Sequence, residues 1–426
     1  MKYKKRKNKI NIKYPCNLLS KIFTFKKNLY RHKRECHLKQ NFKKCSFCSR
    51  YYPRIREHIL RCLKNKNLTL FRSFIDSDIN SNQYYDNNNR AKMKDNPYFE
   101  RNDNIDRINI FRENKDLTGK FEITNKFIGK GTFGVVYFGF DLEKGIPIAI
   151  KCIKNNKENI NNFSKEVNFL NELKEENFFP IIFYAEFNNR NKIIIQSLLG
   201  ATLKDLLYLC GGRLPLFSVL NIAIELFNRI KVIHNHKIIH RDINLSNIIF
   251  GNFSTSNNHE KYGLYIIDYG LSTKFLDDKN NHYDYSKNCK FVGTLEYASI
   301  HTHSKEKQSR RDDIESIFYV ILRLLKGELP WKINKQSLEK TKLYEMVKKI
   351  KNNFIDSDEF KELPPIFKFI YKNIKILEFE EEPPYNFFIT LLENEKEIIL
   401  KNENTSKEKF KYFWLNLIEH ALYSKV

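Results

Sequence analysis

The sequence predicts an α+β chain in which a strand-rich region precedes a helix-rich one, with a small basic module in front of both. Alternating apolar residues begin at Phe121 in FEITNKFIGKGTFGVVYFGF, a pattern typical of paired strands with a tight turn. The apolar residues 219, 223, 226, 230 and 233 recur at the spacing of one helix face. Five of the eight cysteines lie within residues 1–66, which predicts a separate metal-binding module there.

Length and composition favour a globular protein. The 426 residues, 41% of them hydrophobic, suffice for two domains, one of them with a sizeable core. No run of about 18 apolar residues marks a membrane span, and the N-terminus, MKYKKRKNKINIKY, lacks the apolar stretch of a secretory signal. We therefore expect an intracellular monomer, in the nucleus, the cytoplasm or both, with cysteines that are reduced thiols or metal ligands.

The net charge of +25 is concentrated in residues 1–66, which hold 22 Lys plus Arg against two acids and so carry +20. The other 360 residues share only +5. A basic module attached to a nearly neutral body favours a polyanionic partner, nucleic acid first and an acidic membrane surface second. The alternatives are a solvated basic tail and, for Lys2, Lys4, Lys5, Arg6, Lys7 and Lys9, a nuclear-import signal.

A zinc site is predicted at Cys45, Cys48, His58 and Cys62, where C-S-F-C is followed after nine residues by H-x-x-x-C. A C-x-x-C knuckle, with a His and a Cys four apart on one helix face, provides a tetrahedral set of ligands for Zn²⁺. The spacer is shorter than the usual length of about twelve residues, so the helix would start early. A helix with incidental thiols is the alternative.

A weaker unit precedes this one and resembles the two-Cys, two-His finger family. The matching ligand and core positions are Cys16, Phe23, Leu29, His32 and either Cys36 or His37. Leu19 stands where the second Cys belongs, which leaves three ligands. If this unit folds, Asn28 and Arg31 fall at helix positions that face bases.

Residues 67–116 are rich in Asn and Asp and have no sustained apolar period, which predicts a disordered tether. Such a tether keeps a target of the basic module near the next domain and raises its effective concentration. The patterned body spans residues 117–396. In residues 397–426, apolar residues at helical spacing predict a helical extension that packs on the body, with docking of a partner as the alternative.

The glycines Gly129, Gly131 and Gly134 form a G-x-G-x-x-G run, which several nucleotide-binding folds use. Val136 follows two residues after the last glycine, and Lys151, at the end of Ile-Ala-Ile-Lys, follows seventeen residues after it. This combination predicts a strand–turn–strand lid over nucleotide phosphates, with a Lys that reaches the α- and β-phosphates. A dinucleotide-binding fold would instead need a helix after the glycines and an acid about twenty residues on.

Two further patterns complete the predicted nucleotide site. Glu166 lies fifteen residues after Lys151 on an amphipathic helix pattern, so we expect it to pair with this lysine rather than to face solvent. IIIQSLLG predicts a buried strand that runs into a hinge beside a nucleobase. The predicted nucleotide-binding residues are Ile128, Gly129, Gly131, Gly134, Val136, Ala149, Lys151, Glu166, Gln196, Leu198 and Leu199.

His-Arg-Asp at 240–242, followed by Asn247, has the spacing H-R-D-x-x-x-x-N. In this pattern the Asp accepts the proton of an attacking hydroxyl, and the Asn holds Mg²⁺. LYIIDYG supplies a second Mg²⁺ ligand, Asp268. The predicted catalytic residues are Asp242, Lys151, Asn247 and Asp268, with ATP and Mg²⁺ as the bound groups.

In this order and at these offsets, the motifs resemble those of protein kinases, which implies a two-lobed fold with a small β-rich lobe and a large helical lobe. LLGATLKDLL, GTLEYASIHTH and QSRRDDIESIFYVILRLLKGELPW are similar to the casein kinase 1 superfamily. Ser-Ile-His at 299–301 stands close to the Ser-Ile-Asn of that superfamily. The resemblance implies that Asp313 is the helix aspartate that braces the catalytic loop.

Other residues resemble the vaccinia-related kinase branch, namely Asp-Tyr-Gly at 268–270 and Gly-Thr-Leu-Glu at 293–296. Casein kinase 1 proper has Arg at the Glu296 position, in a pocket for acidic or phosphorylated residues. The reversed charge argues against recognition of pre-phosphorylated substrates. Ser-Arg-Arg-Asp-Asp at 309–313 follows casein kinase 1 proper, so the sub-branch stays open.

The resemblance implies a Ser/Thr protein kinase that transfers the γ-phosphate of Mg·ATP to protein hydroxyls. Asn244 departs from it, because these kinases carry a Lys there that contacts the γ-phosphate, and loss of one such donor costs on the order of 10²–10³ in rate. Lys274 follows Asp268 in the chain, but nothing in the sequence places it as a substitute. The alternatives are an impaired pseudokinase scaffold and a nucleic-acid-binding finger protein whose kinase fold senses nucleotide.

Overall fold

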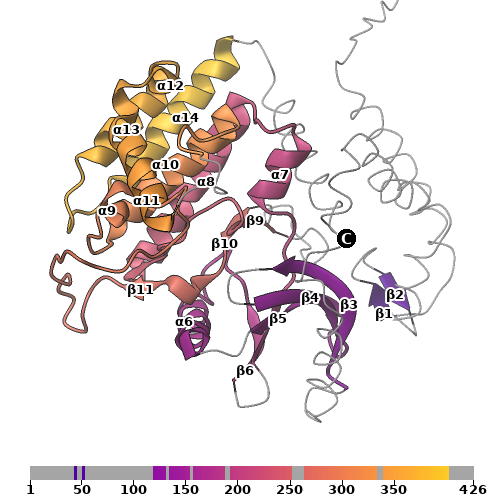
Figure 1. Cartoon of the computed structure of the whole chain (residues 1–426). Coiled ribbons are helices and arrows are strands. Elements are labelled where there is room, and N and C mark those ends of the chain that lie inside the picture. The colour runs from indigo at the N-terminus through magenta and orange to yellow at the C-terminus, as the bar shows by residue number, and fades with distance from the viewer. Residues whose placement is uncertain are drawn as a thin grey trace, which may run out of the picture. The chain divides into compact units, whose positions relative to one another are not determined.

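The chain forms two units, residues 1–108 and 109–426. The computed structural model describes residues 43–45, 50–52, 119–130, 134–153, 157–187, 192–251, 263–332 and 339–402 (Figure 1). The predicted tether at 67–116 and residues 403–426 of the predicted extension lie outside these ranges.

In the first unit, β1 (Lys43–Cys45) pairs antiparallel with β2 (Arg50–Tyr52). The first predicted zinc ligand, Cys45, pairs with Arg50 in this register. The other three ligands, Cys48, His58 and Cys62, lie outside the described residues, as does all of the weaker finger unit. The zinc site therefore stays a prediction.

The second unit begins with a five-stranded antiparallel sheet in the order β3-β4-β5-β7-β6 (Figure 1). The strands are β3 (Phe121–Lys130), β4 (Gly134–Asp141), β5 (Ile146–Ile153), β6 (Ile182–Phe187) and β7 (Lys192–Ser197), and α6 (Lys157–Glu172) follows β5. Alternate isoleucines of β5 and β7 form a small core with Phe121, as the two-residue period of a strand requires. Gly129 pairs with Val136 across β3 and β4, so the two strands of the predicted lid are present, while its turn at 131–133 lies outside the described residues.

The larger lobe is helical and is built around α8 (Leu216–Asn235) and α10 (Arg310–Lys326), which pack on each other. Its other helices are α7 (Leu203–Leu209), α9 (Ile300–His303), α11 (Lys340–Asn352), α12 (Asp358–Lys361), α13 (Pro365–Lys375) and α14 (Tyr385–Asn402), with short 3₁₀ turns η6 (Tyr269–Leu271) and η8 (Phe354–Asp356). The predicted apolar face at 219, 223, 226, 230 and 233 is fully buried in α8. The last helix, α14, packs on α8 and continues beyond residue 396, the predicted end of the body.

The segment between α8 and α9 forms two short antiparallel pairs: β8 (Ile238–Ile239) with β11 (Thr273–Lys274), and β9 (Ile248–Phe250) with β10 (Leu264–Ile266). Ile248 faces Ile266 in the second pair, and the amide of Ile267 donates to the Asn247 carbonyl at 2.9 Å. This register brings the 240–247 loop beside the segment that carries Asp268.

Helix α10 anchors the large lobe, because every residue from Arg311 to Leu322 is buried. Its first turn is stabilised by Asp312, whose carboxylate accepts the Ser309 amide at 2.7 Å. It ends at Gly327, where φ is 85° and an added Cβ would lie 2.9 Å from the Gly212 carbonyl. Only glycine fits this helix end.

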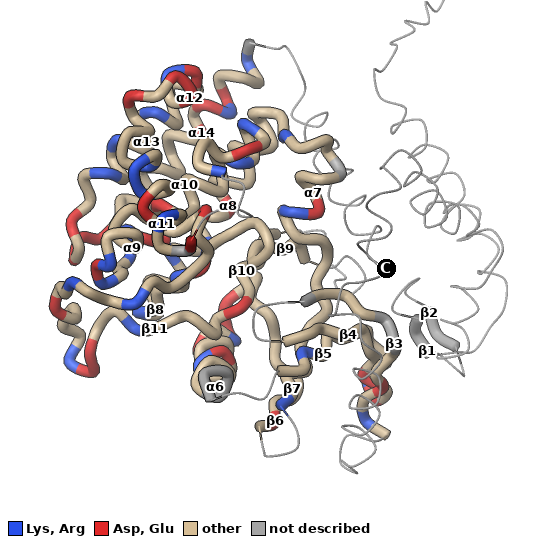
Figure 2. Tube along the Cα trace, viewed as in Figure 1, with Lys and Arg blue, Asp and Glu red and all other residues tan. Residues whose placement is uncertain are grey.

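Charged residues of both signs are interspersed over the helices of the larger lobe (Figure 2). This arrangement agrees with a body that carries little of the net charge, of which residues 1–66 hold +20. Within the described part of the chain, no helix is both long and apolar enough to cross a membrane.

Candidate active site

A buried ion-pair cluster joins the small lobe to the segment after β10. From β5, the Nζ of Lys151 lies 2.7 Å from both carboxylate oxygens of Glu166 on α6. It also lies 3.0 Å from Oδ1 of Asp268. The expected pair of Lys151 with Glu166 is therefore present, and Asp268 is a second anionic partner. Three residues predicted from separate motifs meet at one point.

The charges in this cluster stabilise one another. Burial alone would lower the pKa of Lys151, but the charges of Asp268 and Glu166 outweigh it and hold the pKa above its ordinary value. Burial also pushes the pKa of Glu166 upward, and the adjacent ammonium opposes this shift. Because Lys151 contacts both oxygens of Glu166, we assign the pair as ammonium and carboxylate at neutral pH.

Both carboxylate oxygens of Asp242 are held by neighbouring side chains. The hydroxyl of Thr294 donates to Oδ1 at 2.6 Å, and the amide Nδ2 of Asn247 donates to Oδ2 at 3.0 Å. With Nδ2 used in this way, the amide oxygen of Asn247 remains an acceptor, and the backbone carbonyl of Asn247 accepts the amide of Ile267, the residue before Asp268. Carboxylate and amide oxygens are ligands that Mg²⁺ prefers, so Asn247 and Asp268 fit the predicted metal pair.

The amide of Asn244 lies within the same network. Its Nδ2 donates to the Asp242 carbonyl at 3.1 Å and to the Thr294 hydroxyl at 3.3 Å, and its Oδ1 accepts the Ser246 amide at 2.9 Å. Asn244 thus supports the loop and contributes no positive charge. Lys274 does not replace that charge, because its ammonium contacts Glu172 and the carbonyl of His236.

Asp313 on α10 fixes the backbone of the catalytic loop. Its carboxylate accepts the amides of His240 at 2.7 Å and Arg241 at 2.8 Å, and it is only 1% exposed. His234 lies 3.1 Å from the same carboxylate and 2.6 Å from the hydroxyl of Tyr385. Burial would raise the pKa of Asp313, but the hydrogen bond and charge of His234 and the amide bonds lower it. The contact expected from the resemblance is thus present.

The predicted nucleotide-binding residues that the structure describes lie on β3, β4, β5, β7 and α6 and at the hinge. Gly129 and Val136 pair with each other, and Ala149 pairs with Gln196 across β5 and β7. A Cβ at Gly134 would lie 2.1 Å from the Cys152 carbonyl, so the lid strand packs too closely there for any other residue. Ile128 lies on β3, and Gly131 is outside the described residues.

The hinge residues Leu198 and Leu199 follow β7 directly. The neighbouring amides are used within the fold, because Ser197 donates to the Ile181 carbonyl and Gly200 donates to the Phe250 carbonyl. Among the described residues, no such bond is made by the amides of Leu198 and Leu199. A purine base offers hydrogen-bonding groups along its edge, so this free stretch of backbone fits the predicted adenine site.

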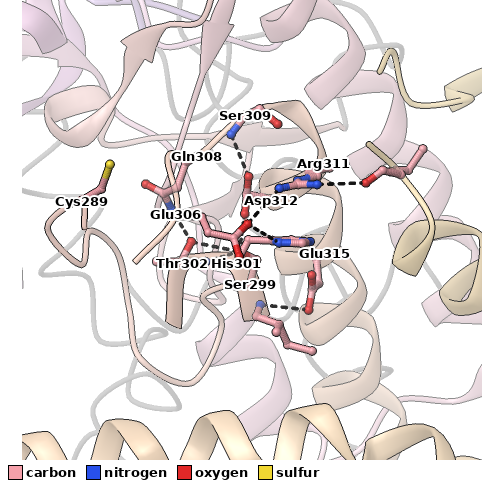
Figure 3. Close-up of polar contacts among 12 residues, drawn as sticks. Cys289, Ser299, His301, Thr302, Glu306, Gln308, Ser309, Arg311, Asp312 and Glu315 are labelled. Atoms are coloured by element: carbon pink, nitrogen blue, oxygen red, sulfur yellow. Dashed lines mark hydrogen bonds and ion pairs between the residues drawn. The ribbon is translucent and has the colours of Figure 1, made fainter. Parts of the chain in front are cut away.

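Past Thr294, the chain is fixed to α10 by a polar cluster (Figure 3). Ser299 donates its hydroxyl to Asp312. His301 lies 2.8 Å from Glu306, whose carboxylate also accepts from Arg311 at 3.2 Å. The cluster explains why the Ser-Ile-His motif lies close to the start of α10.

The sequence analysis assigned no role to two residues that lie at the site, Thr294 and Tyr269. Thr294 lies within a segment that resembles kinases, but 52 residues separate it from Asp242 and no local spacing links them. The second residue, Tyr269, follows Asp268 directly in the chain. Its ring is fully buried against His240, at 5.0 Å between centroids, and its hydroxyl has no partner among the described residues.

Comparison with known proteins places this geometry in a family. The model of the protein kinase domain matches residues 123–402, which include every residue of the candidate active site. The chain belongs to the protein kinase family.

Two curated relatives carry casein kinase I names. The chain is 30% identical over 307 residues to "Casein kinase I homolog RAG8" of Kluyveromyces lactis, an alignment that covers 72% of this chain and 55% of that protein. It is 31% identical over 290 residues to "Casein kinase I homolog 2" of Schizosaccharomyces pombe, covering 68% of this chain and 65% of that protein. The chain thus matches less than two thirds of the length of either relative.

Proposed function

We propose that this chain is a Ser/Thr protein kinase of the casein kinase 1 type, which transfers the γ-phosphate of ATP to hydroxyl groups of protein substrates. The observation that carries the proposal is the arrangement around Asp242, whose two oxygens are held by Thr294 and Asn247. Kinase relatives with casein kinase I names support it. The features that resemble vaccinia-related kinases leave the sub-branch a prediction.

Each residue of the site has a role in this reaction. The substrate oxygen bonds to the γ-phosphorus while the bond from that phosphorus to the oxygen bridging it to the β-phosphate breaks, which leaves ADP. Asp242 accepts the proton of the substrate hydroxyl. Lys151, held by Glu166, orients the α- and β-phosphates. Asn247 and Asp268 would hold Mg²⁺, which neutralises charge on the phosphates when bound.

The experiment is a kinase assay with one acidic and one basic protein substrate, comparing wild type with Asp242→Asn. Asp284→Asn, at an exposed position, is the matched control. We expect transfer to Ser or Thr by wild type and control, and a loss on the order of at least 10²-fold for Asp242→Asn. Intact nucleotide binding in a thermal-shift measurement, with no transfer to either substrate, would favour the pseudokinase scaffold instead.

For residues 1–66 we propose a polyanion-binding role, supported by their net charge of +20 and by the zinc-ligand spacing at Cys45 to Cys62. An intracellular location, in the nucleus, the cytoplasm or both, belongs to the same proposal. Deletion of residues 1–66 separates the functions, since an enzyme keeps its activity on a free peptide. Nucleic-acid affinity of the full chain should fall steeply with salt and be lost on deletion. Binding that survives the deletion would contradict the role.

A further inference from the structure

Lys351 on α11 is buried to 1% exposure in the large lobe, and its ammonium is surrounded by acceptors. Its Nζ donates to the carbonyl of Ala298 at 2.6 Å and to that of Leu295 at 3.2 Å. A third contact, at 3.3 Å, is with Nε2 of His303. An ammonium has three N–H groups, and the two carbonyls match two of them; Nε2 of His303, which also lies 3.3 Å from the Leu295 carbonyl, matches the third in the tautomer that leaves Nε2 unprotonated. The rings of Tyr319 and Trp331 lie over the same group, at 4.5 and 5.0 Å from Nζ to centroid.

The carbonyls held by Lys351 belong to residues 293–298, which we call the substrate segment. This segment contains Thr294, whose hydroxyl donates to Asp242, so the segment flanks the base to which a substrate hydroxyl is presented. A second anchor is Trp331, whose indole N–H donates to the Glu296 carbonyl at 2.7 Å. At the near end, a Cβ on Gly293 would lie 2.5 Å from the Arg241 carbonyl. Lys351 and Trp331 therefore hold the carbonyls of residues 295, 296 and 298, and close packing against Arg241 holds the segment at Gly293.

We infer that Lys351 is a positioning residue that fixes the substrate segment and thereby sets the affinity for the protein substrate. The inference rests on the proposed kinase function and adds a determinant of substrate binding to it. Lys351 touches neither the base nor the predicted nucleotide residues, so its effect reaches the reaction through the substrate segment, whose carbonyls at 295 and 298 it bonds.

The charge state of Lys351 is set by all the elements packed around it. Burial lowers the pKa of Lys351 to about 7; Glu315 on α10 and Glu296 in the substrate segment favour the charged form, and Lys375 on α13 disfavours it. His303 on α9 stays neutral, because burial and the nearby Lys351 lower its pKa to about 3. A neutral amine can still bond both carbonyls, but it loses the charge that strengthens these bonds, so the hold on the segment weakens as pH rises through about 7.

The test compares Lys351→Met with the matched control Lys349→Met, an exposed lysine of the same helix. We expect Lys351→Met to raise KM for a peptide substrate by about tenfold, with kcat and the KM for ATP within about twofold of wild type. Between pH 6 and 8.5, the wild-type peptide KM should rise. Over the same pH range, the peptide KM should stay low in Lys351→Arg and high in Lys351→Met. A wild-type peptide KM in Lys351→Met, or parallel changes in both KM values and kcat, would overturn the inference.

A second measurement does not need catalysis. Hydrogen exchange at the amides of residues 297 and 298, which both bond the Thr294 carbonyl, reports the rigidity of the segment directly. Exchange should be faster in Lys351→Met and unchanged in Lys349→Met. If wild type transfers no phosphate, only the proposed function fails, and the exchange result still shows whether Lys351 fixes the substrate segment. If Lys351→Met does not fold, the pH dependence of exchange in wild type, compared with Lys351→Arg, decides.

Discussion

Thr294 donates its hydroxyl proton to Oδ1 of Asp242 across 2.6 Å, although 52 residues separate the two in the chain. Because Asn247 holds the other oxygen at 3.0 Å, the carboxylate has one orientation before any substrate arrives. The bond thus joins the predicted base to the substrate segment.

Thr294→Ala should lower kcat by about 10- to 100-fold, because the base loses one of its two anchors. Thr294→Ser keeps the hydroxyl and should restore most of the rate. Steady-state kinetics on a peptide substrate measure both. Equal losses in the Ala and Ser variants would show that the methyl group of Thr294, rather than its bond to Asp242, matters.

Asn244→Lys should raise kcat, by a factor of up to the order of 10². The amide of Asn244 is fully used by Asp242, Thr294 and Ser246, so wild type has no cation at this position. Asn244→Met matches the lysine stem without the charge and controls for loss of the amide bonds. Steady-state kinetics at saturating ATP compare kcat of the Lys and Met variants. A Lys variant no faster than the Met variant would rule out the missing cation as the limit on rate.

Glu166→Gln should lower kcat on the order of 10² and raise KM for ATP, because Lys151 loses the anion that orients it. The pair is buried, with side-chain exposures of 8% for Lys151 and 4% for Glu166, so solvent screens it little. Glu172→Gln, on the exposed end of α6, is the matched control. Comparable losses in both variants would point to a general weakening of the helix instead.

Asp312 and its neighbour Asp313 are both buried, yet the pKa values of their carboxyls shift in opposite directions. Burial raises the pKa of Asp312 to about 6, because the hydrogen bonds from Ser299 and Ser309 offset only part of the lost hydration. A carboxyl with a raised folded-state pKa contributes stability that is complete below its unfolded value, near 3.8, and is lost as pH rises through about 6.

Asp312→Asn should therefore gain about 2 kcal/mol of unfolding free energy relative to wild type between pH 4.5 and 7.5. Urea unfolding at a series of pH values measures the difference, with Asp284→Asn as an exposed control. The comparison uses the change with pH rather than the absolute stability, since the amide also alters the bonds to Ser299 and Ser309. A difference between variant and wild type that does not change with pH would contradict the assignment.

Local spacing was sufficient for the parts of the site that one or two neighbouring elements build. Lys151 and Glu166 lie fifteen residues apart on a strand and the next helix, so the pattern alone predicted their pairing. Asp313 followed from the resemblance to kinases rather than from spacing. The two-lobed fold was likewise predicted through that resemblance and agrees with the family match over residues 123–402.

What could not be predicted depends on the tertiary fold. The bond from Thr294 to Asp242 and the bonds from Lys351 to the substrate segment join residues about 50 apart, with no periodicity between them. A lysine on an amphipathic helix is expected to face water, and only the packing of α11 on α9, with Lys351 over the ring of Tyr319 on α10, shows that this one does not. The zinc site and the polyanion partner stay predictions, because they rest on residues 1–66, of which the structure describes only 43–45 and 50–52. The cellular location also stays a prediction, since no contact within the fold bears on it.

Arg241 has a positive φ of 67°, and its amide, with that of His240, is accepted by Asp313 in the core of the large lobe. An arginine seldom adopts this conformation unaided. The loop that carries the base therefore takes its shape when α10 packs, and the entropy of ordering it is lost during folding rather than when substrate binds. Packing of α10 and ordering of this loop are therefore coupled. A chain that has folded its large lobe already holds Asp242 ready to accept a proton.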